Sequence, residues 1–251
     1  GIIMGRYMKY EIKGSYKFIL GVIAIFLILN TISYIKISSD YIRFIAYMIL
    51  FGTSLAAFLY IVGSFKNELY EDRGYLTFTL PLTGREILGS KLIVAMMWFA
   101  ILGTIVFLHN LFMMSWISRV SLSEILEYFS SVDINIIKMF LYCMMLLIIG
   151  VIITLLLIYF SMALSRVSLK NKKIGGIWFV VFLVLSIVFF YFLAKITSWI
   201  PYSIDMSTFK VVVPLNGSIF NLNIAGFIYT IAVGVGAFLT TGYIIDNKID
   251  L

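Results

Sequence analysis

Long apolar runs separated by short polar segments dominate this sequence. Six runs are long enough to cross a membrane as helices, because a span needs about 20 mostly apolar residues. None carries a charge near its middle, where a charged side chain costs at least about 2.5 kcal/mol. We therefore predict an all-α integral membrane protein with one transmembrane domain, 1–251. Its six expected spans cover about 18–35, 41–63, 92–116, 136–164, 174–200 and 222–245.

The composition excludes a soluble globular protein and a disordered one. Hydrophobic residues make up 62% of the chain and charged residues 12%, against about 45–50% and about 25% in ordinary soluble domains. A soluble fold needs a polar surface that so apolar a chain cannot supply. The single cysteine, Cys143, rules out an intrachain disulfide.

The distribution of Lys and Arg predicts the orientation. With both termini inside, the inner side would hold thirteen of the 19 basic residues. Basic residues collect on the cytoplasmic side of membrane proteins, so we expect both termini in the cytoplasm. This also accounts for the net charge of +7 without a nucleic-acid partner. The six outer basic residues would be Lys36, Arg43, Arg119, Lys138, Lys195 and Lys210.

The N-terminal segment 1–17 has the pattern of an interfacial helix that lies on the inner membrane surface. Four basic residues recur at helical spacing on one face, and Glu11 interrupts the more apolar face opposite. The helix could serve as an anchor only, or could gate or contact a partner. The basic residues are Arg6, Lys9, Lys13 and Lys17.

Two outer loops carry recognisable local patterns. Ser121 and Glu124 form a capping-box pair that predicts a short amphipathic helix, expected to pack on the protein rather than to act as a lid. Its apolar stripe is Leu122, Ile125, Leu126 and Phe129. The loop 201–221 predicts a small hairpin, from the β-prone stretch 209–213 and the Asn216-Gly217 turn signal.

The inner segment 65–91 is the most informative. Residues 66–73 are charged and compatible with a helix, and Gly74 follows where a helix C-cap belongs. Pro81 prevents one continuous helix. Thr83 and Glu86 form a second capping-box pair, which predicts that a helix starts near Gly84 and runs into the third span.

This segment resembles the cytoplasmic element of permease subunits of ABC-2-type ATP-binding-cassette exporters. The matching stretches are 72–81 and 85–91, and the basic N-terminal helix and six-span layout match as well. The resemblance implies a coupling helix over 67–75 that docks on a separate ATPase subunit. It further implies two ATPase copies, which bind ATP and Mg, and a second permease copy that makes a homodimer or heterodimer. The implied coupling residues are Glu68, Tyr70, Glu71, Asp72, Arg73, Gly74 and Tyr75.

Catalytic and metal motifs are absent from the sequence. It has no GxxxxGKS/T loop, HExxH or CxxC, so we expect no enzyme activity, cofactor or metal site in this chain by itself. Without carboxylates inside the spans, a proton-coupled carrier is disfavoured. His109 is either a packed histidine or a proton- or substrate-binding residue.

Small and uncharged polar residues complete the prediction. Ala232, Gly236 and Thr240 form a small-residue stripe that serves packing within the chain or a seam between two permeases. Gly52 and Ala56 repeat this pattern. Spans rich in Met and aromatic residues suit an apolar or amphipathic substrate. The resemblance, through the phrase at 74–81, further implies an exporter of amphipathic peptides in a bacterial plasma membrane, similar to exporters of phenol-soluble modulins. The alternative is a membrane receptor, immunity or assembly module that binds a peptide without transporting it.

Overall fold

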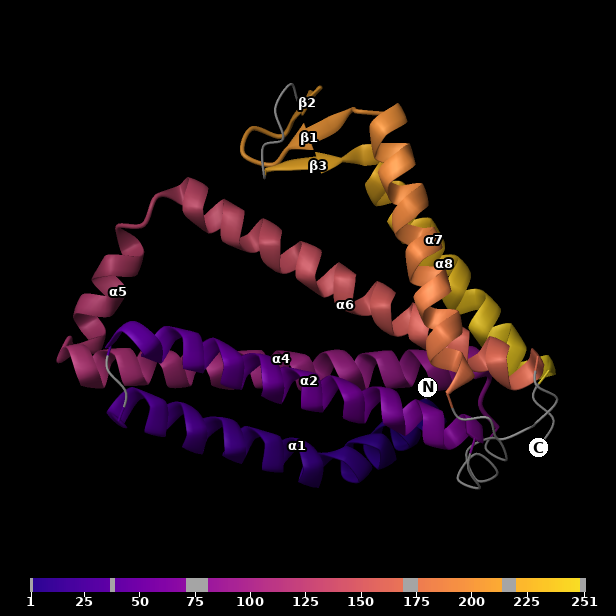
Figure 1. Ribbon diagram of the computed structural model, residues 1–251, viewed down its shortest axis with the longest axis horizontal. Coiled ribbons are helices and arrows are strands. Elements are labelled where there is room, and N and C mark those ends of the chain that lie inside the picture. Colours follow the sequence, from indigo (N-terminus) through magenta and orange to yellow (C-terminus); the bar gives the residue numbers. More distant parts are fainter. Residues whose placement is uncertain (1, 37–38, 71–80, 169–175, 214–219, 249–251) are drawn as a thin grey trace. The chain divides into compact units, whose positions relative to one another are not determined.

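The computed structural model describes residues 2–36, 39–70, 81–168, 176–213 and 220–248. Most of them are helical (Figure 1). Six helices are long and apolar enough to cross a membrane, all except α5, as a multi-pass membrane protein requires. The helices are α1 (Ile2–Lys36), α2 (Ser39–Tyr70), α4 (Gly84–Ser118), α5 (Leu122–Ser130), α6 (Ile134–Ser168), α7 (Ile177–Trp199) and α8 (Ile224–Asn247).

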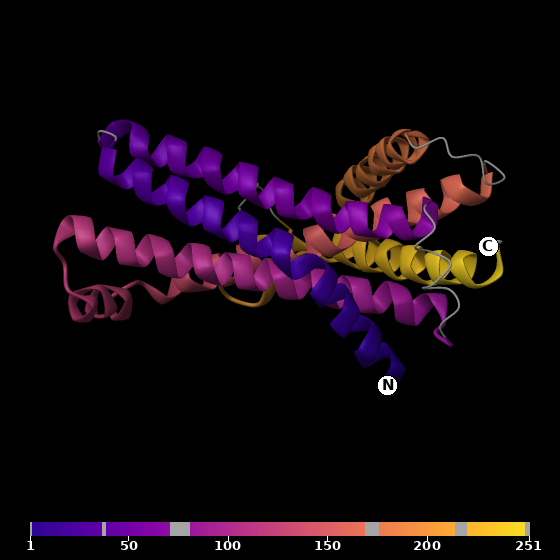
Figure 2. The same cartoon turned by 90° about the horizontal axis from the view of Figure 1, so that it is seen from below.

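Helix α1 runs without a break through the segment predicted to be interfacial. Figure 2 shows that its N-terminal part bends away from the rest of the helix. Gly14 and Ser15 provide a local cause, because Gly/Ser pairs are among the usual sites of helix kinks. The Ser15 hydroxyl donates to the carbonyl of Glu11 at 2.7 Å, one turn earlier.

The described residues of the chain divide into two compact units. Unit 1 comprises 1–65 and 89–131, and unit 2 comprises 66–88 and 132–251. Helices α2 and α4 each continue from one unit into the other.

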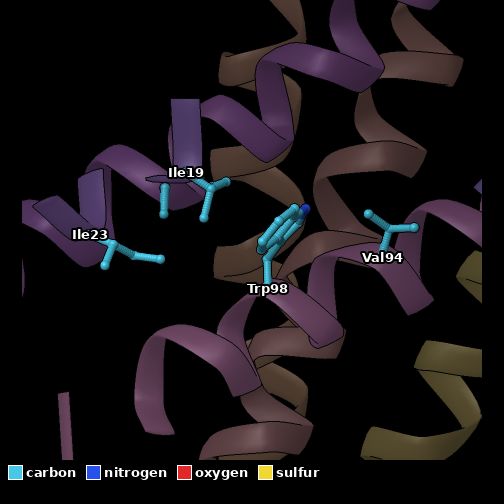
Figure 3. Packing of buried hydrophobic residues seen from close by; sticks show 5 residues of the cluster. Ile19, Ile23, Val94 and Trp98 are labelled. Carbon is cyan, nitrogen blue, oxygen red and sulfur yellow. The ribbon is translucent and has the colours of Figure 1, made fainter. Parts of the chain in front are cut away.

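Unit 1 is built on side chains from α1, α2 and α4. Its buried cluster contains Ile19, Ile23, Ala57, Val94 and Trp98. Figure 3 shows the Trp98 ring between Ile19 and Val94. The indole Nε1 donates to the Ser15 hydroxyl at 2.9 Å, so this aromatic residue is buried with its polar atom satisfied.

The predicted helix α5 is confirmed, including its capping box. Ser121 accepts from the backbone of Glu124, and the Glu124 side chain accepts from the backbone of Ser121. Leu126 is 68% exposed and Phe129 is exposed as well. These two stripe residues therefore do not make the packing contacts that we expected of them.

Helices α6, α7 and α8 pack on one another in unit 2. Ile153 and Leu157 of α6 meet Phe189 of α7 in a buried cluster. Beyond the ends of α7 and α8 lies a small antiparallel sheet in the order β2-β1-β3 (Figure 1). Its strands are β1 (Ser203–Asp205), β2 (Lys210–Val212) and β3 (Asn221–Asn223).

The sheet extends the hairpin that the sequence predicted. Strand β2 lies inside the β-prone stretch 209–213, but its partner β1 was not predicted. Ser203 pairs with Val212 on one side and with Asn223 on the other. The Asn216-Gly217 turn lies outside the described residues. The fold is thus helical with one short sheet, rather than entirely α.

Candidate functional site

The end of α2 is fixed to α6 at the start of the connection between α2 and α4. Tyr70, the last residue of α2, is buried, and its hydroxyl donates to the carbonyl of Met162 at 3.0 Å. The guanidinium carbon of Arg166 lies 5.7 Å from the Tyr70 ring centroid, within the range of a cation–π contact. The last turn of α2 therefore packs into unit 2.

The start of α4 is fixed to α8 at the other end of the connection. The Gly84 amide donates to the carboxylate of Asp246 at 2.5 Å, and an acidic group at a helix N-terminus is favourable. A Cβ on Gly84 would lie 2.5 Å from the Gly242 carbonyl oxygen, so only glycine fits. We call these contacts the connection anchor; it consists of Tyr70, Met162, Arg166, Gly84, Gly242 and Asp246.

The predicted capping box at the start of α4 is confirmed. The Thr83 amide donates to the Glu86 carboxylate at 2.9 Å, and the Glu86 amide donates to the Thr83 hydroxyl at 3.3 Å. This pair satisfies two backbone donors at the helix start. It fixes the residue at which the connection ends and α4 begins.

The predicted coupling residues fall in two places. Glu68 and Tyr70 belong to the last turn of α2 and are buried. Residues 67–70 thus form one helix with the second span rather than a separate element. The other five, Glu71, Asp72, Arg73, Gly74 and Tyr75, lie outside the described residues.

A cavity of about 760 Å³ lies among α6, α7 and α8 in unit 2. Its lining includes Phe182, Phe189, Phe190 and Phe227, and small residues such as Gly150 leave the space open. A Cβ on Gly150 would meet no atom within 4 Å. The cavity has the size and apolar lining of a small-molecule site.

Three of the four hydroxyl groups around this cavity, those of the threonines, are bonded within their own helices. Thr154 donates to the Gly150 carbonyl, Thr197 to that of Leu193, and Thr230 to that of Gly226. Asn223 uses its amide on the Ile200 carbonyl and its oxygen on the Gly226 amide. The threonine hydroxyls have no hydrogen left to donate, and most of the remaining lining is hydrocarbon.

A polar network joins α1 and α4 within unit 1. The Asn30 amide nitrogen lies 3.0 Å from His109 Nδ1 and 3.3 Å from Asn110 Oδ1. The Tyr34 hydroxyl donates to the same Asn110 oxygen at 3.0 Å. Thr31 lies 3.0 Å from His109 Nε2. His109 is therefore held on both ring nitrogens, as a packed histidine is.

The network allows one arrangement of protons. The Asn110 amide donates to the Val106 carbonyl, which fixes its oxygen toward Asn30. The Asn30 amide then donates to His109 Nδ1, and because Thr31 gives its hydrogen to the Leu27 carbonyl, Nε2 must carry the ring hydrogen. His109 is neutral, and the buried Asn30 Oδ1 has no hydrogen-bond partner among the described residues.

A buried ion pair links α1 with α4 in the same unit. Lys91 Nζ lies 3.0 Å from Glu11 Oε1, and the two side chains are 3% and 16% exposed. Lys91 also donates to the Ser64 hydroxyl of α2 at 3.2 Å. Sequence analysis identified Glu11 as an interruption but not its partner 80 positions away.

The remaining predicted site residues lie on exposed faces of α1 and α8. Arg6, Lys9, Lys13 and Lys17 are all exposed on α1, and Ala232, Gly236 and Thr240 are all exposed on α8. Among the described residues, no neighbouring helix covers this stripe on α8. The buried face of α8 lies beside it and carries Gly234, Ala237, Thr241 and Ile245.

Asp205 stabilises the turn of the hairpin. Its carboxylate accepts from the hydroxyl of Ser207 at 2.6 Å and from its amide at 2.8 Å. These bonds favour the charged form, so the Ser207 hydroxyl and amide and the Thr208 hydroxyl lower the pKa of Asp205. The chain then reaches Phe209, which has a positive φ of 55°.

The parts of the chain that the structure describes contain no group of three or more His, Cys, Asp or Glu side chains able to hold a metal ion. Comparison of the chain with family models, with curated proteins and with solved structures gave no match. The functional interpretation therefore depends on the site geometry and the sequence.

Proposed function

We propose that this chain is the membrane-spanning subunit of an ATP-driven exporter of the ABC-2 type. The connection anchor is the observation that carries the proposal. Both ends of the connection between α2 and α4 are bonded to unit 2, one to α6 and the other to α8. A partner that moved this connection would act directly on these two helices.

The energy source would be a separate subunit. The sequence has no GxxxxGKS/T loop, so two ATPase subunits would bind ATP and Mg and dock on the connection. Their closure would shift the connection and switch the paired permeases between inward and outward states by rigid-body movement. The exposed stripe Ala232, Gly236 and Thr240 on α8 would face the second permease copy.

The cavity among α6, α7 and α8 supports a hydrophobic or amphipathic substrate, with a peptide as the expected class. Its aromatic lining and internally bonded threonine hydroxyls would accept apolar side chains at little cost in unpaired polar groups. Phe side chains would adapt by rotation to ligands of different shape.

Co-purification with the ATPase subunit encoded beside this chain tests the proposal. We expect a stable complex whose ATP turnover changes when an amphipathic peptide is added. The triple substitution Glu71→Ala, Asp72→Ala, Arg73→Ala should abolish the complex while membrane insertion persists. A chain that binds no ATPase would instead support the receptor or immunity module.

Tyr70→Phe separates docking from coupling. It keeps the ring beside Arg166 but removes the hydrogen bond to Met162, so the complex should form while peptide-stimulated turnover falls severalfold. Tyr60→Phe is the matched control, because the Tyr60 hydroxyl donates to the Gly14 carbonyl inside unit 1. Equal turnover in both variants would contradict the role of the connection anchor.

Gly150→Phe tests the cavity. The new ring would occupy space that is open, so the chain should fold while peptide stimulation is lost. Gly103→Phe is the control, because Gly103 is also open but lies on α4, outside the cavity. Equal peptide stimulation in the two variants would exclude the cavity as the substrate site.

A further inference from the structure

The N-terminal part of α1 presents a one-sided basic face. Arg6, Lys9, Lys13 and Lys17 are all exposed. Successive residues of a helix turn by about 100°, so these four positions fall within an arc of roughly 80°. We call these four residues the basic stripe.

The rotation of the basic stripe is fixed by the opposite face of α1. Tyr7, Ser15 and Ile19 on that face are buried, and the Gly14 carbonyl accepts from Tyr60 of α2 at 2.9 Å. The helix therefore cannot roll, and the basic stripe points away from unit 1.

No acidic side chain of α1 offsets the basic stripe. Glu11 is the one acidic residue between 2 and 17, and its carboxylate is bonded to Lys91 Nζ at 3.0 Å. Two tyrosines accompany the stripe: Tyr10 is 70% exposed and Tyr16 is exposed as well. Tyrosine is typical of the level at which headgroups meet the hydrocarbon core.

The length of the basic stripe requires a tilted helix if all four cations are to meet headgroups. From Arg6 to Lys17 the helix rises about 16 Å, whereas the headgroup layer on each side is only about 5–8 Å thick. A helix continuing straight out of the membrane would carry the first cations into water. The bend of α1 in Figure 2 lies in this N-terminal part and would lay the stripe along the layer.

We propose that the basic stripe of α1 is a binding surface for the phosphate groups of anionic membrane lipids. Four cations on one face attract an anionic surface within about a Debye length, and the tyrosines beside them fit the interface. The inference does not depend on ATP-driven transport, because it would hold for any function of the chain.

The test uses the full chain, purified in detergent and mixed with equal amounts of phosphatidylglycerol and phosphatidylcholine. Native mass spectrometry counts the lipids retained on each protein. We expect the wild-type chain to prefer phosphatidylglycerol and the Lys9→Gln, Lys13→Gln variant to lose this preference severalfold. The control is Lys195→Gln, Lys210→Gln, which removes the same charge from two exposed residues of unit 2 and should retain lipids as the wild type does.

Three outcomes would overturn the inference. Equal phosphatidylglycerol retention by the two double variants would show that net charge, and not the basic stripe, attracts the lipid. Displacement of the lipid by inorganic phosphate at the same concentration would identify a free-phosphate site. Retention of an added oligonucleotide in place of the lipid would identify nucleic acid as the partner. Unchanged thermal unfolding of both double variants would exclude misfolding as the cause of any loss.

Discussion

Four glycines of unit 2 lie at close contacts, whereas glycines along the helices of unit 1 lie in open space. A Cβ added to Gly14, Gly52 or Gly103 would meet nothing within 4 Å. In unit 2 the closest atom would lie at 2.5 to 2.7 Å from a Cβ on any of four glycines: Gly84, Gly226, Gly234 and Gly242. That atom belongs to the backbone at Gly84 and to a side chain at the other three, and three further glycines among the described residues of unit 2 are open. Small residues are a common way to bring membrane helices close together, and unit 2 uses them at these four positions.

Polar side chains join the helices in the interior of unit 1. The Glu11–Lys91 ion pair connects α1 with α4, and the network around His109 connects the same two helices farther along. The polar groups around the cavity of unit 2 mostly bond their own helix. We infer that unit 1 is sensitive to changes of charge and hydrogen bonding, whereas unit 2 is sensitive to changes of volume.

The largest effect is expected from Lys91→Met in unit 1. It would leave the Glu11 carboxylate without its cation in a mostly buried site, at a cost of about 3 kcal/mol in the free energy of unfolding. Thermal unfolding in detergent, followed by size-exclusion chromatography, measures the loss. Adding Glu11→Leu should recover most of it, because no unpaired charge then remains. A Lys91→Met variant as stable as the wild type would show that the ion pair does not stabilise unit 1.

Gly84→Ala should have the next largest effect, because it tests close packing in unit 2. The methyl group would collide with the Gly242 carbonyl oxygen, and overpacking of this kind costs about 1–3 kcal/mol. Gly103→Ala on the same helix lies in open space and should gain up to about 1 kcal/mol from helix propensity. The two substitutions should therefore shift the thermal unfolding midpoint in opposite directions. Midpoint shifts of the same sign would refute the comparison.

His109→Phe should lower the free energy of unfolding by about 1–2 kcal/mol, because the buried Asn30 amide would lose an acceptor. Thr154→Val in unit 2 is the matched change, since the Thr154 hydroxyl only bonds the carbonyl one turn earlier. The free energy of unfolding of the Thr154→Val variant should stay within about 0.5 kcal/mol of the wild-type value. Unfolding midpoints of the two variants measure the difference, and equal losses would remove the distinction between the units.

The smallest effect is a pH dependence confined to the hairpin. The lowered pKa of Asp205 means that its charged form stabilises the turn at neutral pH. This contribution is lost as the pH falls through the lowered folded-state pKa. Protection of the amides in β1 and β2, corrected for the intrinsic exchange rate at each pH, should therefore fall in acid, and Asp205→Asn should remove that dependence. Acid-induced loss of protection that persists in the variant would place its cause elsewhere.

Local patterns in the sequence predicted local structure well. The capping pairs Thr83–Glu86 and Ser121–Glu124 both form, because a cap depends on residues three positions apart. The six apolar runs likewise correspond to six long helices, because length and hydropathy are properties of one segment.

Contacts between distant segments could not be predicted. The small-residue pattern identified Gly236 on α8, yet the buried glycines of that helix are Gly226, Gly234 and Gly242, since only the neighbouring helices determine which face is covered. For the same reason, the sequence did not identify Lys91 as the partner of Glu11. The charged stretch after the second span read as a separate helix, but no helix breaker precedes Tyr70, and α2 continues to that residue.

The hydrogen bond between Trp98 and Ser15 gives unit 1 an intrinsic optical reporter. The chain has four tryptophans; Trp98 is buried, whereas Trp116 and Trp199 are exposed. Bromine atoms on lipid chains would quench the emission of the exposed indoles and leave that of Trp98 largely intact. Trp178 on α7 is half-buried, so in a Trp178→Phe variant the emission that survives quenching follows whether α1 and α4 remain together, without any attached dye.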